Sequence, residues 1–270
     1  MSKGIIVHAF NNEEIDYVKQ AIDVAKRAKK HLDLPTSVIT DMDIDNSVFD
    51  NVIKFNTPQR YTKKLYNNGN NGKHLTFKNN ARVLSYELTP YDQTLMIDSD
   101  IIICDDTYKN CFTQNNPLLM YRKAYHLANE SKHIDYREFD KVSDASVDFY
   151  WATCVYFTKC KQNKIFFDLL QHIEEEWTHY RMLYQITQQT YRNDFAFSIG
   201  IHIMSGHSKA NFVGPMPGKL YYTIDKDTLH SIKDDELTFI IDNNPIKTKN
   251  MTVHAMNKFN LEELLWPKEF

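Results

Sequence analysis

Two aspartates, Asp98 and Asp100, are the residues of this chain best suited to do chemistry. They are separated by Ser99 in the largely apolar run YDQTLMIDSDIIICDD at residues 91–106. An ionised carboxylate left unpaired inside a protein core is very costly. The pair is easier to explain where a buried strand ends at a site, because carboxylate oxygens are preferred ligands of Mg²⁺ and Mn²⁺.

Strand geometry favours this interpretation. Successive side chains of a strand point to opposite faces, so we expect Asp98 and Asp100 on one face and Ser99 on the other. The neutral imidazole of His254, far along the chain, could complete the ligand set and would favour Mn²⁺. The alternative is that the aspartates cap a strand end and accept hydrogen bonds from loop amides, with His254 as a core histidine.

The elements before the motif predict an open α/β sheet. A helix expected at residues 79–88 leads into the strand that ends at Asp98. Ligands of open α/β sheets collect at the carboxyl ends of the strands, so the position of the motif suits a binding site. Apolar runs and helical periodicity also predict strands at 4–10, 37–40 and 51–55, a helix at 13–31, and a mobile, partly basic loop at 57–80.

The remainder of the chain continues this alternation. Residues 122–144 are polar and are expected to form an exposed insertion. Asn193 or Asp194 could cap a helix that runs toward Gly206, although Phe197 and Ile201 also fit the period of a strand. The other expected elements are strands at 118–121, 147–159, 219–224 and 237–241, helices at 165–184 and 193–206, and a last segment at 252–258 before an amphipathic tail.

Composition limits the class of protein. Apolar residues make up 42% and charged residues 25% of the 270 positions, which allows one large domain with a substantial core. The net charge of -3 argues against a protein that coats nucleic acid. The sequence shows neither a membrane span nor the cleavage region of a secretory signal, so we expect a cytoplasmic protein. The four cysteines form no CxxC pair and are expected to be reduced.

Four features taken together resemble a known enzyme family. They are the strand GIIVHAF followed by a helix, Arg82 before the motif, the run YWATCVYFTK leading to RNDFAFSIGIHIMSG, and the C-terminal VHAMNKF. In this order they resemble the metal-dependent nucleotide-sugar glycosyltransferases of the GT-A fold, particularly the glycogenin-like retaining group. The middle of the chain more narrowly resembles glycosyltransferases of tailed phages, and the composition is typical of an AT-rich genome.

The resemblance implies a fold and its division. The fold would be a GT-A, Rossmann-like α/β domain over residues 1–270, with a central mixed, mostly parallel sheet flanked by helices. Residues 1–106 would form the nucleotide-sugar-binding half. Residues 107–270 would form the acceptor half and contribute a C-terminal segment to the metal and diphosphate site.

The resemblance also implies roles for individual residues. Asp98, Asp100 and His254 would bind the metal, and Asp194 would orient the donor and acceptor sugars. VHAMNKF departs from the family, because the glycine that usually separates the histidine from the lysine is absent and the spacing is shorter. The donor would be contacted by Ala9, Phe10, Asn11, Asp41, Arg82, Asp98, Ser99, Trp151, Ala152, Thr153 and Lys258.

These residues suggest a division of labour in the reaction. A bound divalent metal would neutralise the diphosphate leaving group, while Lys258 and Arg82 would add fixed positive charge. A carboxylate such as Asp194 or Asp148 could act on the oxocarbenium-like sugar centre as a base, a nucleophile or a positioning group. That choice decides between inversion and retention, and the sequence leaves it open. Outside catalysis, Trp151 could simply pack and Arg82 could be a solvated charge.

We expect a UDP-sugar donor, Mn²⁺ or Mg²⁺ as cofactor, and transfer of a hexosyl or pentosyl group. The phage resemblance favours a hydroxymethylated pyrimidine in DNA as acceptor. Cations at 63–64, 73–82 and 122–137 could contact its phosphates or could be solvated faces.

Several alternatives remain. The acceptor could be a cell-surface glycan or a protein. A nucleotidyltransferase would share the fold, but its glycine-rich N-terminal loop is missing here. An inactive nucleotide-sugar-binding module is the third possibility. A phage protein would act in the host cytoplasm, and the oligomeric state is open.

Overall fold

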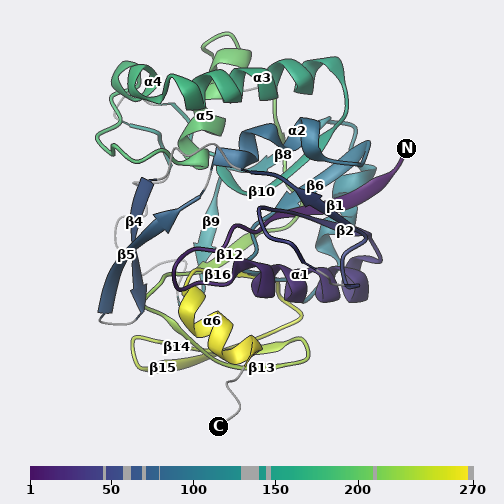
Figure 1. The fold of residues 1–270 in the computed structure, drawn as a ribbon, viewed down its shortest axis with the longest axis vertical. Coiled ribbons are helices and arrows are strands. Elements are labelled where there is room, and N and C mark those ends of the chain that lie inside the picture. Colours follow the sequence, from purple (N-terminus) through teal and green to yellow (C-terminus); the bar gives the residue numbers. More distant parts are fainter. Residues whose placement is uncertain are drawn as a thin grey trace.

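A seven-stranded sheet forms the centre of the molecule (Figure 1). In spatial order its strands are β11 (Gly214–Pro215), β8 (Leu118–Tyr121), β10 (Trp151–Thr158), β6 (Gln93–Ile97), β1 (Lys3–His8), β2 (Thr36–Thr40) and β3 (Asn51–Lys54). Every neighbouring pair is parallel except the two made by β10, which runs antiparallel to β6 and β8. The expected α/β fold with a mixed, mostly parallel central sheet is confirmed.

This arrangement comes from a computed structural model of the chain. The residues it describes are 1–44, 47–56, 62–68, 71–78, 80–128, 140–143, 147–208 and 212–266.

Helices cover both faces of the central sheet (Figure 1). One face carries α1 (Tyr17–Leu32). The other face carries the 3₁₀ helix η1 (Asn80–Leu84), α2 (Ser85–Leu88), α3 (Lys161–Glu175) and α5 (Asn193–Met204), with α4 (Trp177–Leu183) following α3.

The start of α1 shows how local chemistry sets a boundary. Oδ1 of the N-cap residue Asp16 accepts a hydrogen bond from the amide of Lys19 at 3.1 Å, which satisfies a free donor of the first turn. Just before it, the side chain of Asn12 accepts from the amide of Ile15 at 2.9 Å. The helix therefore begins at Tyr17, later than the expected residue 13.

A second sheet begins directly after the two aspartates. In spatial order its strands are β7 (Ile101–Ile102), β16 (Val253–Ala255), β12 (Leu220–Thr223) and β9 (Ala124–His126). Only residues 98–100 separate β6 of the central sheet from β7, so the motif connects the two sheets.

The C-terminal part adds a three-stranded antiparallel sheet of β13 (Thr228–Lys233), β14 (Glu236–Ile241) and β15 (Asn244–Lys249). It packs with α6 (Lys258–Leu265) around a second, smaller core. Leu237, Phe239 and Ile241 alternate along β14 and are buried in this core. Of the three strands, only β14 was expected, because β13 and β15 are largely polar.

Residues 57–80 do not form the expected loop. Within them, β4 (Thr62–Asn68) and β5 (Asn71–Phe77) pair as an antiparallel hairpin that stands beside the central sheet (Figure 1). Tyr66 and Leu75 are buried with Ile15 in a small core of their own. This packing holds the hairpin against the N-terminal segment. Residues 57–61, 69–70 and 79 lie outside the described residues.

Two expected helices also differ. The one at 165–184 is two helices, α3 and α4, separated by Glu176. The one at 79–88 is the 3₁₀ helix η1 followed by the short α2.

The polar insertion at 122–144 contains β9, and its residues 129–139 and 144 lie outside the described residues. No helix in the described ranges is long and apolar enough to cross a membrane. The division into halves at 1–106 and 107–270 and the cytoplasmic location stay predictions.

Candidate active site

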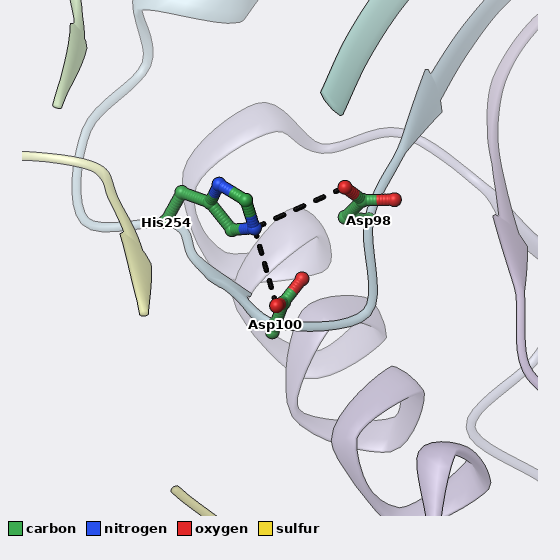
Figure 2. Close-up of side chains that lie close together, drawn as sticks. All are labelled: Asp98, Asp100 and His254. Carbon is green, nitrogen blue, oxygen red and sulfur yellow. Dashed lines mark ion pairs between the residues drawn. The ribbon is translucent and has the colours of Figure 1, made fainter. Parts of the chain in front are cut away.

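The two aspartates lie in the short connection between β6 and β7. The amide of Asp98 donates to the carbonyl of Thr153 on β10 at 3.0 Å, and the amide of Ile101 donates to the carbonyl of Asp98 at 3.3 Å. The prediction that Asp98 and Asp100 share a strand face is therefore wrong in its geometry. The chain turns here because it must leave the central sheet to pair with β16. The turn still brings both carboxylates to one place (Figure 2).

Strand pairing brings His254 to the motif. In the antiparallel pair β16–β7, His254 stands opposite Ile101, and the amide of Ala255 donates to the carbonyl of Asp100 at 2.9 Å. The imidazole Nε2 consequently lies 3.1 Å from Oδ2 of Asp100 and 3.9 Å from Oδ2 of Asp98 (Figure 2). The predicted association of His254 with the two aspartates is thus present in the fold.

Two cations flank the acidic pair. Arg82 of η1 lies 2.7 Å from Oδ1 of Asp98, and Lys258, the first residue of α6, contacts Oδ2 of Asp100. Both cationic side chains are largely buried, so their charges are poorly screened by water. The site therefore holds fixed charges of both signs within a few ångströms.

Burial and these partners shift the two carboxyl pKa values in opposite directions. Burial raises the pKa of Asp98, and Arg82 offsets only part of this effect. Burial alone would also raise the pKa of Asp100, but the charges of His254 and Lys258 hold it well below its usual range. The charge of Asp100 in turn raises the pKa of Lys258 above its ordinary value, against the effect of burial.

The residues present fit a divalent metal. One donor atom from each of Asp98, Asp100 and His254 lies within 4.8 Å of the others. Two carboxylates and an imidazole are a donor set that suits Mn²⁺ and also serves Mg²⁺. In the described part of the chain, Oδ2 of Asp98 and Oδ1 of Asp100 accept no hydrogen bond, so each aspartate keeps an oxygen for a cation.

The motif faces a cavity of about 650 Å³. Its wall combines residues from the end of β1, the β4–β5 hairpin, η1, β10, the start of α5, β12 and the C-terminal segment. Of the predicted site residues, those that line the cavity are Phe10, Arg82, Asp98, Ser99, Asp100, Trp151, Thr153, Asp194, His254 and Lys258.

Asp194 lies in the first turn of α5 and is held by two partners. Its Oδ1 accepts a hydrogen bond from the amide of Ala152 at 2.9 Å, and its Oδ2 pairs with Arg192 at 2.8 Å. It does not cap its own helix, whose N-cap is Arg192. Asp194 instead links α5 to β10, the strand that also carries Trp151 and Thr153.

Five predicted residues do not line the cavity. Asp148 pairs with Arg122 at 2.8 Å and with Lys141 at 2.6 Å. Asp41 pairs at 2.8 Å with Lys78, which does line it. The remaining three are Ala9, which is fully buried, Asn11, whose side chain bonds to residues around the start of α1, and Ala152, whose amide holds Asp194.

Comparison with known proteins finds a likeness only among solved structures. No protein-family model matches the sequence, and no curated protein sequence matches it. The apo form of the glycosyltransferase GlyE of Streptococcus pneumoniae is 13% identical with a TM-score of 0.44, over 82% of this chain and 45% of that one. An active-site mutant of LgtC is 13% identical with a TM-score of 0.48, over 78% of this chain and 72% of that one. LgtC has also been solved, as a galactosyltransferase, with donor and acceptor sugar analogues.

The chain spans about 45% of the length of GlyE. Sequence identity of 13% and TM-scores below 0.5 carry no argument about the activity, so the activity has to be argued from the residues of the site.

The hairpin contributes cavity residues that the sequence reasoning missed. Lys63, Lys64, Tyr66 and Phe77 all line the cavity. A usable signal was present, since two Asn-Gly steps lie between segments in which polar and apolar residues partly alternate, as in β-hairpins. His8, interpreted as structural, also lines the cavity, and its Nε2 lies 2.8 Å from Oγ of Ser85.

Proposed function

We propose that this protein is a metal-dependent glycosyltransferase that moves a sugar from a UDP-sugar to an acceptor hydroxyl. The observation that carries the proposal is the convergence of Asp98, Asp100 and His254 on one wall of the cavity, with Arg82 and Lys258 beside them. Oxygen and imidazole ligands next to fixed cations are the arrangement that a metal-bound diphosphate requires.

The charges of the site support the proposed binding of the donor diphosphate. A divalent ion held by Asp98, Asp100 and His254 supplies Lewis-acid neutralisation of the diphosphate. Arg82 and Lys258 place positive charge where the leaving group becomes more negative. The identity of the ion, Mn²⁺ or Mg²⁺, and of the nucleotide, UDP, belong to the proposal.

Residues of β10 and α5 support the proposed position of the transferred sugar. Trp151 offers an aromatic face to the sugar beside Thr153, and its ring lies 5.6 Å from that of Tyr222. Phe10 at the end of β1 lies on the wall where we propose that the uridine binds. Both oxygens of Asp194 are engaged, by an amide and by a guanidinium, so we assign it to positioning and charge stabilisation at the sugar.

The proposed reaction is balanced without a further reactant. The bond between the sugar C1 and the diphosphate oxygen breaks, and its electron pair leaves with the diphosphate. The acceptor oxygen bonds to C1 and releases its proton to the departing diphosphate or to solvent. The anomeric configuration of the product, read by NMR, decides between inversion and retention, and its sugar decides between hexosyl and pentosyl transfer.

The acceptor is the least constrained part of the proposal. A hydroxymethylated pyrimidine in phage DNA stays a prediction, as does its alternative, a glycan or protein. Contacts to DNA phosphates would make activity fall steeply with salt. Salt-insensitive transfer to an oligosaccharide would remove the DNA acceptor.

The experiment that tests the proposal is a survey of UDP-sugars for acceptor-independent hydrolysis, with Mn²⁺, with Mg²⁺ and with a chelator. We expect metal-dependent release of UDP from one donor. UTP formation from a UDP-sugar and pyrophosphate would instead indicate a nucleotidyltransferase. Metal-dependent UDP binding without any turnover, even with acceptors supplied, would indicate an inactive binding module.

A further inference from the structure

Two lysines of the β4–β5 hairpin line the cavity, and the charge of Lys63 acts on the nearby Glu13. Lys63 and Lys64 line it, and neither forms an ion pair with a carboxylate in the described part of the chain. The neighbouring cations differ, because Arg82, Arg192 and Lys258 are each paired with a cavity aspartate. Lys64 therefore presents positive charge that no direct ion pair in the described part of the chain neutralises.

Aromatic rings hold Lys64 in a defined place. Its ammonium lies 5.4 Å from the ring centroid of Tyr66 and 5.1 Å from that of Phe77. Rings at this distance attract a cation without neutralising its charge. Tyr66 is in turn fixed by a hydrogen bond from the hydroxyl of Tyr17 at 3.1 Å and by its burial in the small core with Ile15. The ammonium is thus presented from a packed surface.

Lys64 lies within electrostatic range of both ends of the proposed reaction. The charges that act on it are those of Lys258 and Asp100 at the metal end and of Arg192 and Asp194 at the sugar end. Crowding by protein atoms, and then repulsion from Lys258 and Arg192, lower the pKa of Lys64 to about 8. Lys64 as a whole residue is nevertheless exposed to solvent.

The charge balance of the cavity points to a ligand with more negative charge than the donor brings. Six lysines and arginines line it against four aspartates, although the whole chain carries a net charge of -3. One of the six, Lys78, is neutralised by Asp41 outside the wall, so the excess is one positive charge. The charges of a diphosphate and of a divalent metal largely cancel, so binding a donor would leave this excess in place. Because the positive charge is gathered in one cavity, it suits a single anionic group better than a long polyanion.

We propose that Lys64 is the main cation of a phosphate-binding subsite for the acceptor, with added charge from its neighbour Lys63 in β4, so that the acceptor carries a phosphate group near its reacting hydroxyl. Lysine binds phosphate as a point charge and needs no fixed fork geometry. The inference rests on the proposed glycosyl transfer, because that reaction makes the second anion part of an acceptor.

The test uses the full chain saturated with UDP and Mn²⁺, into which inorganic phosphate is titrated in a calorimeter. We expect phosphate to bind at one site, with affinity at least tenfold weaker in Lys64→Gln and weaker again in the Lys63→Gln, Lys64→Gln double variant. The matched control is Lys73→Gln on the same hairpin, because Lys73 pairs with Glu14 and does not line the cavity. It removes the same charge and should bind phosphate as wild type does.

The proposal is overturned if wild type binds no phosphate, or if Lys64→Gln binds it as tightly as Lys73→Gln does. Thermal unfolding of each variant shows whether a loss reflects misfolding, and a folded Lys64→Gln with unchanged affinity is decisive. A short single-stranded oligonucleotide is the second probe. Binding that requires the oligonucleotide and falls steeply with salt would replace the single phosphate group by a nucleic-acid acceptor.

The two proposals fail separately. If wild type does not bind UDP with Mn²⁺, the proposed function fails, and phosphate titrated without UDP still reports on the hairpin lysines alone. If UDP and Mn²⁺ bind as expected but the lysine variants match the control, only the phosphate subsite is lost.

Discussion

The imidazole Nε2 of His254 lies 3.1 Å from Oδ2 of Asp100, a contact created by the antiparallel register of β16 beside β7. We predict that His254→Ala weakens Mn²⁺ binding by at least about 100-fold, because it removes one of three protein ligands and loss of even an outer partner costs 10–100-fold. Calorimetric titration with Mn²⁺ measures this. His230→Ala, which removes an exposed histidine of β13, is the control. Equal Mn²⁺ affinities for the two variants would exclude His254 as a ligand.

Arg82 is predicted to serve both stability and donor binding. Replacing it by methionine leaves Asp98 without its partner at 2.7 Å, which should lower the free energy of unfolding by about 1–3 kcal/mol. It should also raise the KM for the donor, since a diphosphate contact is lost. Arg82→Lys keeps the charge and should recover part of both effects. Urea unfolding measures the free energy of unfolding, and steady-state kinetics measure the donor KM. If both are unchanged in Arg82→Met, Arg82 contributes neither to stability nor to donor binding.

Asp194 and Asp148 were both candidates for the sugar centre, and the structure separates them. Asp194→Asn keeps an acceptor for the amide of Ala152 but removes the negative charge. We therefore expect kcat to fall by about 100-fold or more with little change in the donor KM. Asp148→Asn acts on a carboxylate outside the cavity wall and should change kcat by less than about twofold. If kcat falls equally in the two variants, Asp148 contributes to catalysis as much as Asp194 does.

His8 should make stability depend on pH. Burial, followed by the nearby charge of Arg82, lowers the pKa of His8 well below its usual value in the folded protein. The unfolded chain therefore binds one more proton once the pH falls below about 6.5, and stability present above that pH is lost as the pH falls. The loss is at most about 1.4 kcal/mol per pH unit for one proton.

Urea unfolding at several pH values between 5 and 8, compared with His8→Gln, measures this contribution. The variant should lose less stability than wild type between pH 6.5 and 5. Identical dependence of stability on pH in wild type and His8→Gln would mean that the pKa of His8 is the same in the folded and unfolded states.

Local sequence signals were sufficient for the strands of the central sheet except the two-residue β11, which was not expected. The apolar runs of β1 and β6 and the helical period of α1 each identify their element, because one face or both faces of each are buried. Asp98 could be placed at the end of β6 for the same reason. The α3–α4 break was not visible, because the apolar period continues past Glu176 into the buried Trp177.

The remaining features of the site depend on contacts between segments that are distant in the sequence. The register that sets His254 opposite Ile101 is a tertiary fact that no local pattern predicted, although His254 itself was a candidate ligand. The β4–β5 hairpin combines charged and apolar residues on one inward face, where Lys64 lies over Tyr66, so its strands resemble a polar loop in the sequence. Asp148 shows that proximity to β10 in the sequence does not decide whether a carboxylate lines the cavity, so its catalytic role stays a prediction.

The central claim is that Asp98, Asp100 and His254 hold the metal that binds the donor diphosphate. The most direct measurement is calorimetric titration of UDP into wild type and Asp100→Asn, with Mn²⁺ and with a chelator. We predict tight binding only for wild type with Mn²⁺, and affinity at least about 100-fold weaker for the variant or without the metal. UDP binding of equal strength with and without Mn²⁺, or unchanged in folded Asp100→Asn, would contradict the claim.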